Sequence, residues 1–150
     1  MNLEIARARH RGNRIKIHGP EAFEGMRRAG QLTAKVLDLL VGEVKPGITT
    51  QSLDDFVFEF AMDHNAVPAP LNYRGFTRSI CTSLNHVVCH GIPGERIIKD
   101  GDILNIDVTL ILDGWHGDSS RMYPVGEISR AAERLIDVTY EALMRGIAAV

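Results

Sequence analysis

The strongest constraint on the fold is the stretch 102–123, whose pattern predicts a β-hairpin with acidic side chains on one face. Asp113-Gly114 is a strong hairpin turn signal, because a type I′ turn needs two residues that tolerate positive φ. The flanking residues alternate in polarity. Ile106, Val108, Leu110 and Leu112 form an apolar face, and Asn105, Asp107 and Thr109 form a polar one.

A turn at 113 and 114 would pair Thr109 with Asp118 and Asp107 with Ser120, so the two acids would share a face. Diagonal neighbours of this kind lie roughly 7 Å apart or less at Cβ. Two such carboxylates repel unless a cation lies between them or one keeps its proton. A pair of divalent metals fits, because metals about 3.5 to 4 Å apart are held by carboxylates in hydrolases that include aminopeptidases. The pattern equally allows both acids to face water, and a bulge at Gly117 would move Asp118 to the opposite face.

Composition and charge are those of one globular domain. The 150 residues are 45% hydrophobic and 24% charged, with a net charge of −2. This balance gives no reason to expect specific nucleic acid or a membrane as a partner. No apolar run approaches the roughly 20 residues of a membrane span, and the N-terminus has no signal-peptide core, so we expect a cytoplasmic protein. Cys81 and Cys89 are expected to be free thiols and small buried hydrophobic residues.

Residues 1–18 form a basic N-terminal extension. This segment contains one acidic residue, Glu4, and five basic residues, Arg7, Arg9, Arg11, Arg14 and Lys16. A solvated terminal segment is favoured over a contact with RNA or the ribosome. Residues 15–18 are expected to form a short edge strand.

Three amphipathic helices are predicted. The first covers 21–44, with Phe23, Met26, Leu32, Val36, Leu37, Leu39 and Leu40 at helical spacing. The second is capped by Thr49 or Thr50 and reaches about residue 64. The third follows Ser129 and is unfinished at Val150. Residues 65–76 are expected to form a loop that presents Tyr73 and Phe76, and 79–90 to form a strand.

His90 is the candidate catalytic residue. It lies at the end of the predicted strand, before Gly91, where functional side chains are often displayed, and imidazole exchanges a proton near neutral pH. A hydrogen-bonded structural role is the alternative. His86 would share its strand face, and His116 would share the face of Asp118. Thr109, opposite Asp118, is predicted to hold that carboxylate by a hydrogen bond.

Four blocks in order closely resemble the type I methionine aminopeptidases: CHGIP at 89–93, KDGD at 99–102, NIDVT at 105–109 and DGWHGDSSRM at 113–122. The resemblance covers roughly residues 19–150. It implies the α/β (α+β) pita-bread fold, with two pseudo-symmetric halves around a dinuclear metal site. It also implies removal of the initiator methionine from nascent chains when the second residue is small.

The resemblance assigns roles to individual residues. Asp107 would bind one metal, Asp118 would bridge two, and His90 would hydrogen-bond the scissile amide. Tyr73, Phe76 and Cys81 would line the pocket for the methionine side chain. The cofactors would be two divalent ions, with cobalt, manganese, iron and zinc as candidates, and a glutamate would act as general base. The partners would be nascent N-termini, with the ribosome as a further candidate, and the complete protein would be a monomer.

The remaining ligands implied by the resemblance, one His and two Glu, belong to the second half of the fold. Residues 19–150 are therefore expected to form the first half, truncated in a helix, and to be inactive alone. A truncated sequence is favoured over a fragment that has lost catalysis. Two alternatives are a prolidase or aminopeptidase P, whose N-terminal domain has no room in 18 residues, and a non-catalytic pita-bread binding module, which would tend to lose the acids.

Overall fold

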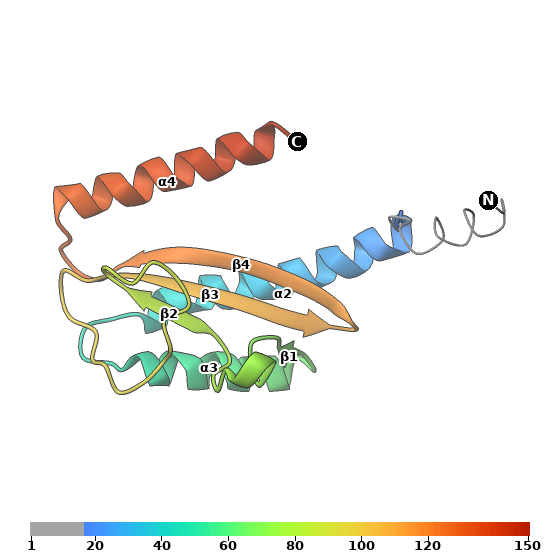
Figure 1. Ribbon diagram of the computed structural model, residues 1–150, viewed down its shortest axis with the longest axis horizontal. Helices are drawn as coiled ribbons and strands as arrows, with labels where there is room; N and C mark the ends of the chain where they lie inside the picture. The colour runs from blue at the N-terminus through green and yellow to red at the C-terminus, as the bar shows by residue number, and fades with distance from the viewer. Residues whose placement is uncertain (1–16) are drawn as a thin grey trace, which may run out of the picture.

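The computed structural model describes residues 17–150, which form three α-helices, four strands and one 3₁₀ turn (Figure 1). In chain order these are α2 (Pro20–Glu43), α3 (Thr50–Asp63), β1 (Val67–Pro68), η1 (Tyr73–Gly75), β2 (Cys81–Leu84), β3 (Ile103–Leu112), β4 (Trp115–Pro124) and α4 (Arg130–Ala148). The predicted basic extension lies almost entirely outside the described residues. Of the edge strand predicted at 15–18, residues 15 and 16 also lie outside them, and Ile17 and His18 are described but are not in a strand.

The hairpin of β3 and β4 is the centre of the sheet. Its register runs unbroken from Leu112↔Trp115 to Ile103↔Pro124, so there is no bulge at Gly117. Asp113 and Gly114 have φ of 50° and 81°, as a type I′ turn requires. The other edge of β3 pairs antiparallel with β2 at its start and with β1 near its end. The predicted hairpin, with its pairing and turn, is confirmed.

Helices α2 and α3 cover one face of the sheet (Figure 1). The alternation of β3 places Ile106, Val108 and Leu110 in this core. The helices contribute Leu32, Val36, Leu37, Leu40, Leu53, Val57 and Phe60. The predicted helix positions are confirmed, including Thr49 as the cap of α3, whose hydroxyl accepts a hydrogen bond from the Ser52 amide at 3.2 Å.

Three residues of the predicted first core stripe are instead exposed. Phe23, Met26 and Leu39 are 62%, 48% and 45% exposed. The first half of α2 buries the small residues Ala22, Gly25 and Ala29 instead. The reason is the close approach of β4, since a Cβ added at Gly117 would collide with the Ala29 carbonyl.

Helix α4 begins after Ser129, whose hydroxyl accepts from the Ala132 amide at 3.2 Å, as predicted. It ends at Ala148 rather than continuing to the last residue. None of its residues is buried, and apolar side chains such as Leu135 and Ile147 are 60% and 59% exposed. Among residues 17–150, no helix is both long and apolar enough to cross a membrane.

The predicted strand at 79–90 is much shorter than expected. Strand β2 ends at Leu84, because Asn85 has a left-handed φ of 53° and turns the chain. The Asn85 side chain accepts from the Ile103 amide at 3.0 Å and donates to Asp102 at 2.8 Å, which holds this turn against β3. His86 therefore does not share a strand face with His90, and the shared face predicted for the two histidines is wrong.

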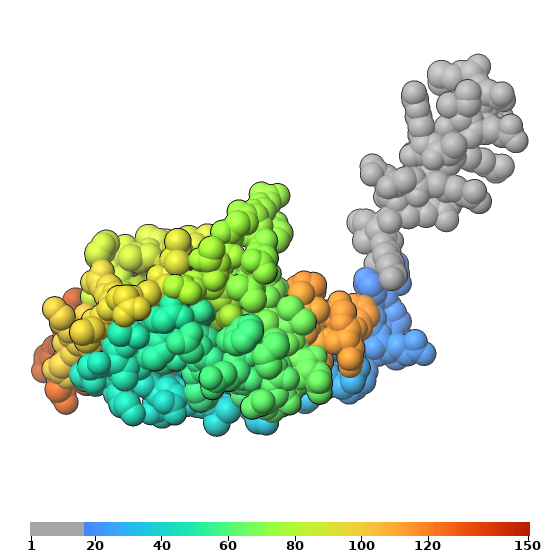
Figure 2. Space-filling model, turned by 90° about the horizontal axis from the view of Figure 1, so that it is seen from below, coloured from blue at the N-terminus to red at the C-terminus, as the bar shows by residue number. Residues whose placement is uncertain are grey.

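The loop predicted at 65–76 is only partly irregular. It contains the short strand β1 and the η1 turn, and Asn72 and Arg74 have left-handed φ values of 66° and 49°. Figure 2 shows this yellow-green segment projecting from the body of the molecule. The segment thus stands at the rim of the open face of the sheet.

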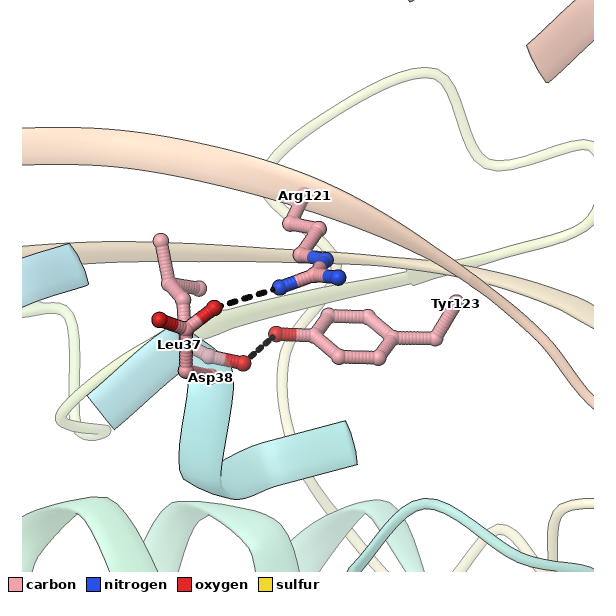
Figure 3. A network of polar contacts seen from close by, with 4 residues as sticks. All are labelled: Leu37, Asp38, Arg121 and Tyr123. Carbon is pink, nitrogen blue, oxygen red and sulfur yellow. Dashed lines mark hydrogen bonds and ion pairs between the residues drawn. The ribbon is translucent and has the colours of Figure 1, made fainter. Parts of the chain in front are cut away.

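Two polar contacts join β4 to α2 at the far end of the hairpin (Figure 3). The Tyr123 hydroxyl donates to the Leu37 carbonyl at 2.6 Å, and Arg121 donates to the Asp38 carboxylate at 2.8 Å. Tyr123 is 4% exposed, whereas the Arg121 and Asp38 side chains are 46% and 77% exposed. The tyrosine contact is therefore expected to contribute more to stability.

Tyr123 provides a test by pH. Burial raises its pKa to about 12, with Arg121 lowering and Asp38 raising it. Since an unfolded tyrosine ionises near pH 10, folding retains the proton, and this contribution is complete below pH 10 and lost as pH rises toward 12. We expect wild type to lose up to roughly 3 kcal/mol more stability than Tyr123→Phe over this range in urea titrations. Tyr140→Phe, on exposed α4, is the control, and parallel curves for wild type and Tyr123→Phe would contradict the assignment.

Candidate metal centre

The two acids lie on the face of the hairpin opposite the core. Asp107 is in the middle of β3, between buried Ile106 and Val108, and Asp118 is on β4 directly opposite Thr109. Asp107 is half-buried and Asp118 is exposed. Both line one pocket of about 760 Å³. The prediction that they share a face is confirmed, and the alternative that places Asp118 on the other face is wrong.

Thr109 orients Asp118. Its hydroxyl donates a hydrogen bond to the Asp118 carboxylate at 2.9 Å across the hairpin. The predicted contact is therefore present. A hydrogen bond of this kind fixes the rotamer of a carboxylate and so determines where its second oxygen points.

The same pocket brings together every residue singled out from the sequence as a site residue. Tyr73 and Phe76 come from the projecting segment, Cys81 from β2, and His90 from the loop after β2. The pocket is also lined by residues that sequence reasoning did not place there, among them Ala69, Arg74, Thr77 and Ile92. Ile92 lies two residues after His90, so its nearness to His90 in the sequence is the signal that could have placed it there. His116 lines the pocket as well, on the face of Asp118 as predicted, whereas His86 does not.

The electrostatics of the pocket centre on Asp107. Burial raises its pKa above the ordinary value, the Asp118 carboxylate raises it further, and His90 lowers it. The carboxylates are thus near enough to repel, and the imidazole is near enough to offset part of that repulsion. A cation at this place would favour the charged form of both acids.

Cys81 is neutral at physiological pH. Burial raises the pKa of its thiol to about 11, with Asp107 and Cys89 adding to the effect. A protonated, buried thiol is a wall of the pocket rather than a metal ligand, since metals bind thiolates. Cys89 is exposed, so the prediction that both cysteines are buried is wrong for this one, because the chain has left β2 before reaching it. Both thiols are free, as predicted.

The acid pair fits a divalent ion as part of its ligand set. Carboxylate oxygens are hard ligands suited to such ions, and the two acids project from one face into one pocket. Within residues 17–150, no group of three or more His, Cys, Asp and Glu side chains is arranged to hold a metal. Asp107 and Asp118 would therefore fill only part of a coordination shell.

These features define the class of protein. An antiparallel sheet backed by two helices, with an acid pair on its open face, is about half of a metallopeptidase domain with the pita-bread fold. The model of metallopeptidase family M24 matches residues 24–150, and the chain belongs to this family.

The relatives agree with this classification. A methionine aminopeptidase of Rickettsia prowazekii is 59% identical over 136 residues, which are 91% of this chain and 52% of that protein. Its crystal structure superposes with a TM-score of 0.88 over 89% of this chain and 54% of that one. The methionine aminopeptidase of Thermotoga maritima is 32% identical, with a TM-score of 0.87 over 91% of this chain and 55% of that one. The chain thus spans about half the length of the relatives it matches.

A more distant similarity concerns the fold alone. The Xaa-Pro dipeptidase of Bacillus anthracis is 20% identical, with a TM-score of 0.76 over 87% of this chain and 35% of that one. The predicted fold class is confirmed by these structures and by the family match. The division of the chain at residues 18 and 19 stays a prediction.

Proposed function

We propose that this chain is the first half of a methionine aminopeptidase, which removes the initiator methionine from nascent proteins when the second residue is small. The observation that carries this proposal is the gathering of the acid pair, His90 and the apolar wall in one pocket, in a chain 59% identical to such an enzyme. The geometry of the pocket supports a role for each residue.

Asp107 and Asp118 are the proposed metal ligands, with Asp118 bridging two ions and Thr109 holding it in place. Bound divalent ions would lower the pKa of a water molecule to make a nucleophile and would polarise the peptide carbonyl. We propose cobalt, manganese, iron or zinc as the metal. The remaining ligands and the general base would come from the second half of the fold.

His90 is the proposed contact for the scissile amide. It lines the pocket, and its effect on the pKa of Asp107 supports a position near the acid pair. An imidazole there would hydrogen-bond the amide and keep the reacting carbonyl beside the acids. Tyr73, Phe76 and Cys81 would form the wall against the thioether side chain, whose flexible, polarisable chain suits a slot with few polar groups.

The proposed partners are the N-termini of nascent polypeptides in the cytoplasm. The ribosome is a further candidate partner, which the basic residues 1–18 would contact. The complete protein is proposed to be a monomer. A prolidase or aminopeptidase P is less supported, because the similarity to those enzymes is 15–23% identity against 59% for the methionine aminopeptidase. A non-catalytic binding module is less supported because both acids are present and face the pocket.

A chimera tests the proposal. We expect the 150-residue chain alone to release no methionine from a Met-Ala-Ser peptide with Co²⁺ or Mn²⁺, since two carboxylates do not complete a dinuclear site. Joined to the remaining half of the Rickettsia prowazekii enzyme, it is expected to release methionine in a metal-dependent manner. Release would be measured by chromatography of free methionine, with and without a chelator.

Two controls accompany the chimera. The Rickettsia half alone measures any activity that does not need this chain, and a Leu-Ala-Ser peptide tests the preference for methionine. Metal-dependent release of methionine by the 150-residue chain alone would contradict the proposal that the remaining metal ligands lie in the second half of the fold. An inactive chimera that is folded and binds metal would contradict the proposed function.

A further inference from the structure

His90 reaches the pocket from a strained backbone. Its φ is 54°, in the left-handed region, which is unfavourable for a non-glycine residue unless its surroundings hold it there. His90 lies in the loop after β2, five residues beyond the turn at Asn85. Val88, in the same loop, is 93% exposed. Solvent-facing neighbours of this kind do not hold a strained residue, so the restraint must come from the sheet.

Gly91 provides the restraint. Its amide donates to the Ser83 hydroxyl at 3.1 Å, and its carbonyl accepts from the Thr82 amide at 2.8 Å. The fit is close, since a Cβ at residue 91 would collide with the Thr82 carbonyl. One of the two hydrogen bonds is made by backbone, but the other depends on a side chain.

That side chain, Ser83, is 4% exposed and shares the pocket face of β2 with Cys81, two residues before it. Its hydroxyl lies beneath the loop rather than in the pocket, and Ser83 is not among the residues that line the pocket. A buried hydroxyl on a strand usually has a specific partner, because its desolvation otherwise costs free energy. Here the partner is the residue that follows His90.

We propose that Ser83 is a positioning residue for His90. By accepting from the Gly91 amide, its hydroxyl keeps His90 in the left-handed conformation that directs the imidazole into the pocket beside Asp107. An effect of this contact on catalysis rests on the proposed function of His90. The hydrogen bond to Ser83 and the left-handed conformation of His90 do not depend on that proposal. Ser83 itself does not line the pocket, so its proposed role is exerted through Gly91 and His90.

The matched control lies next to it. Thr82 is also on β2 and is 5% exposed, but its hydroxyl is buried with no hydrogen-bond partner among the described residues. Thr82 pairs with Ile106 on the core side of the sheet. Thr82→Val therefore removes a buried hydroxyl from the same strand without touching the Gly91 contact, and it retains the backbone amide.

The test is NMR of the 150-residue chain, which needs no activity. A positive φ brings the amide and α protons of a residue close together, so wild-type His90 should give a strong intraresidue cross-peak between them. We expect Ser83→Ala to weaken this cross-peak and to speed exchange of the Gly91 amide about five- to tenfold, the equivalent of one hydrogen bond. Ser83→Thr, which keeps the hydroxyl, and Thr82→Val should retain both signals.

An unchanged His90 cross-peak and Gly91 exchange rate in Ser83→Ala would overturn the proposal. If Ser83→Ala does not fold, wild type still decides, because rapid exchange of the Gly91 amide or a weak His90 cross-peak would refute the contact. In the chimera, Ser83→Ala should lower kcat/KM by about ten- to a hundredfold, as misplacement of a substrate-contacting group does, with recovery in Ser83→Thr. A chimera inactive in every form would contradict the proposed function and leave the NMR result standing.

Discussion

Asp118→Asn in the chimera is expected to abolish metal-dependent methionine release and to weaken binding of the metal by more than about a hundredfold. Loss of residues that merely support metal ligands costs about 10- to 100-fold, so loss of Asp118, the proposed bridging ligand, should cost more. Asparagine keeps the shape of the side chain and, through its carbonyl oxygen, an acceptor for the Thr109 hydroxyl, which now lies 2.9 Å from Asp118. The variant therefore removes the charge while leaving the hairpin unchanged. Metal affinity would be measured by isothermal titration calorimetry with Mn²⁺, and activity by methionine release.

The matched control is Asp113→Asn, on the turn of the same hairpin. Asp113 pairs with Arg28 at 3.1 Å on the surface and is not among the residues that line the pocket. It has a left-handed φ of 50°, which asparagine also accepts. Both substitutions remove one negative charge from the hairpin, but only one removes it from the pocket. Equal losses in the two variants would contradict a specific role for Asp118.

Thr109→Val distinguishes the proposed ligand, Asp118, from the residue that is proposed to orient it. It removes the hydrogen bond to Asp118 and keeps both carboxylates, so we expect a loss of metal affinity within about 10- to 100-fold and a smaller loss of activity than in Asp118→Asn. A smaller effect of Thr109→Val than of Asp118→Asn follows from the hydrogen bond between the two residues. If both acids were only solvated surface groups, neither substitution would change metal affinity in this order.

The hairpin was the most predictable part of this molecule because several local rules agree there. Asp113-Gly114 specifies the turn, the alternation from Asn105 to Leu112 specifies the face, and together they determine the pairing of Asp118 with Thr109. The helices were predictable for a similar reason, since capping residues such as Thr49 and Ser129 coincide with the start of an apolar period.

Errors arose where a local pattern has more than one structural solution. Helical spacing predicted Phe23 and Met26 in the core, but spacing does not say which side of a helix the sheet approaches most closely. The pattern of residues 79–90 predicts one strand, whereas the left-handed backbone of Asn85 and the hydrogen bond from the Ile103 amide to its side chain end β2 at Leu84. The backbone of His90 was unpredictable for the same reason, because its conformation depends on Ser83 and Thr82 rather than on its own type.

The pocket shows the same division between local and tertiary information. Motif resemblance identified Tyr73, Phe76 and Cys81, and all three line the pocket. The resemblance did not indicate that Asn72 and Arg74 have left-handed backbone in this segment, or that burial raises the pKa of the Cys81 thiol to about 11. Such properties arise from neighbours that are distant in sequence.

The contact between β4 and α2 leads to the largest expected change in stability. Gly117 lies on the core face of β4, and its carbonyl accepts from the buried Thr33 hydroxyl at 2.9 Å. A Cβ at this position would collide with the Ala29 carbonyl and lie 2.7 Å from the Thr33 hydroxyl oxygen. The colliding atoms belong to helix backbone and to a fully buried side chain, so neither can move without shifting α2.

Gly117→Ala is therefore expected to lower the free energy of unfolding by about 3 kcal/mol or more, at the upper end of the range for overpacked cores. The control is Gly30→Ala, one residue after Ala29 in α2. Nothing lies within 4 Å of a Cβ there, and the helix should gain about 0.5 to 1 kcal/mol from the better helix former. Urea titrations of the two variants should thus shift in opposite directions from wild type. If Gly117→Ala is no less stable than wild type, α2 and β4 are not in the close contact that places the acid pair on the open face of the sheet.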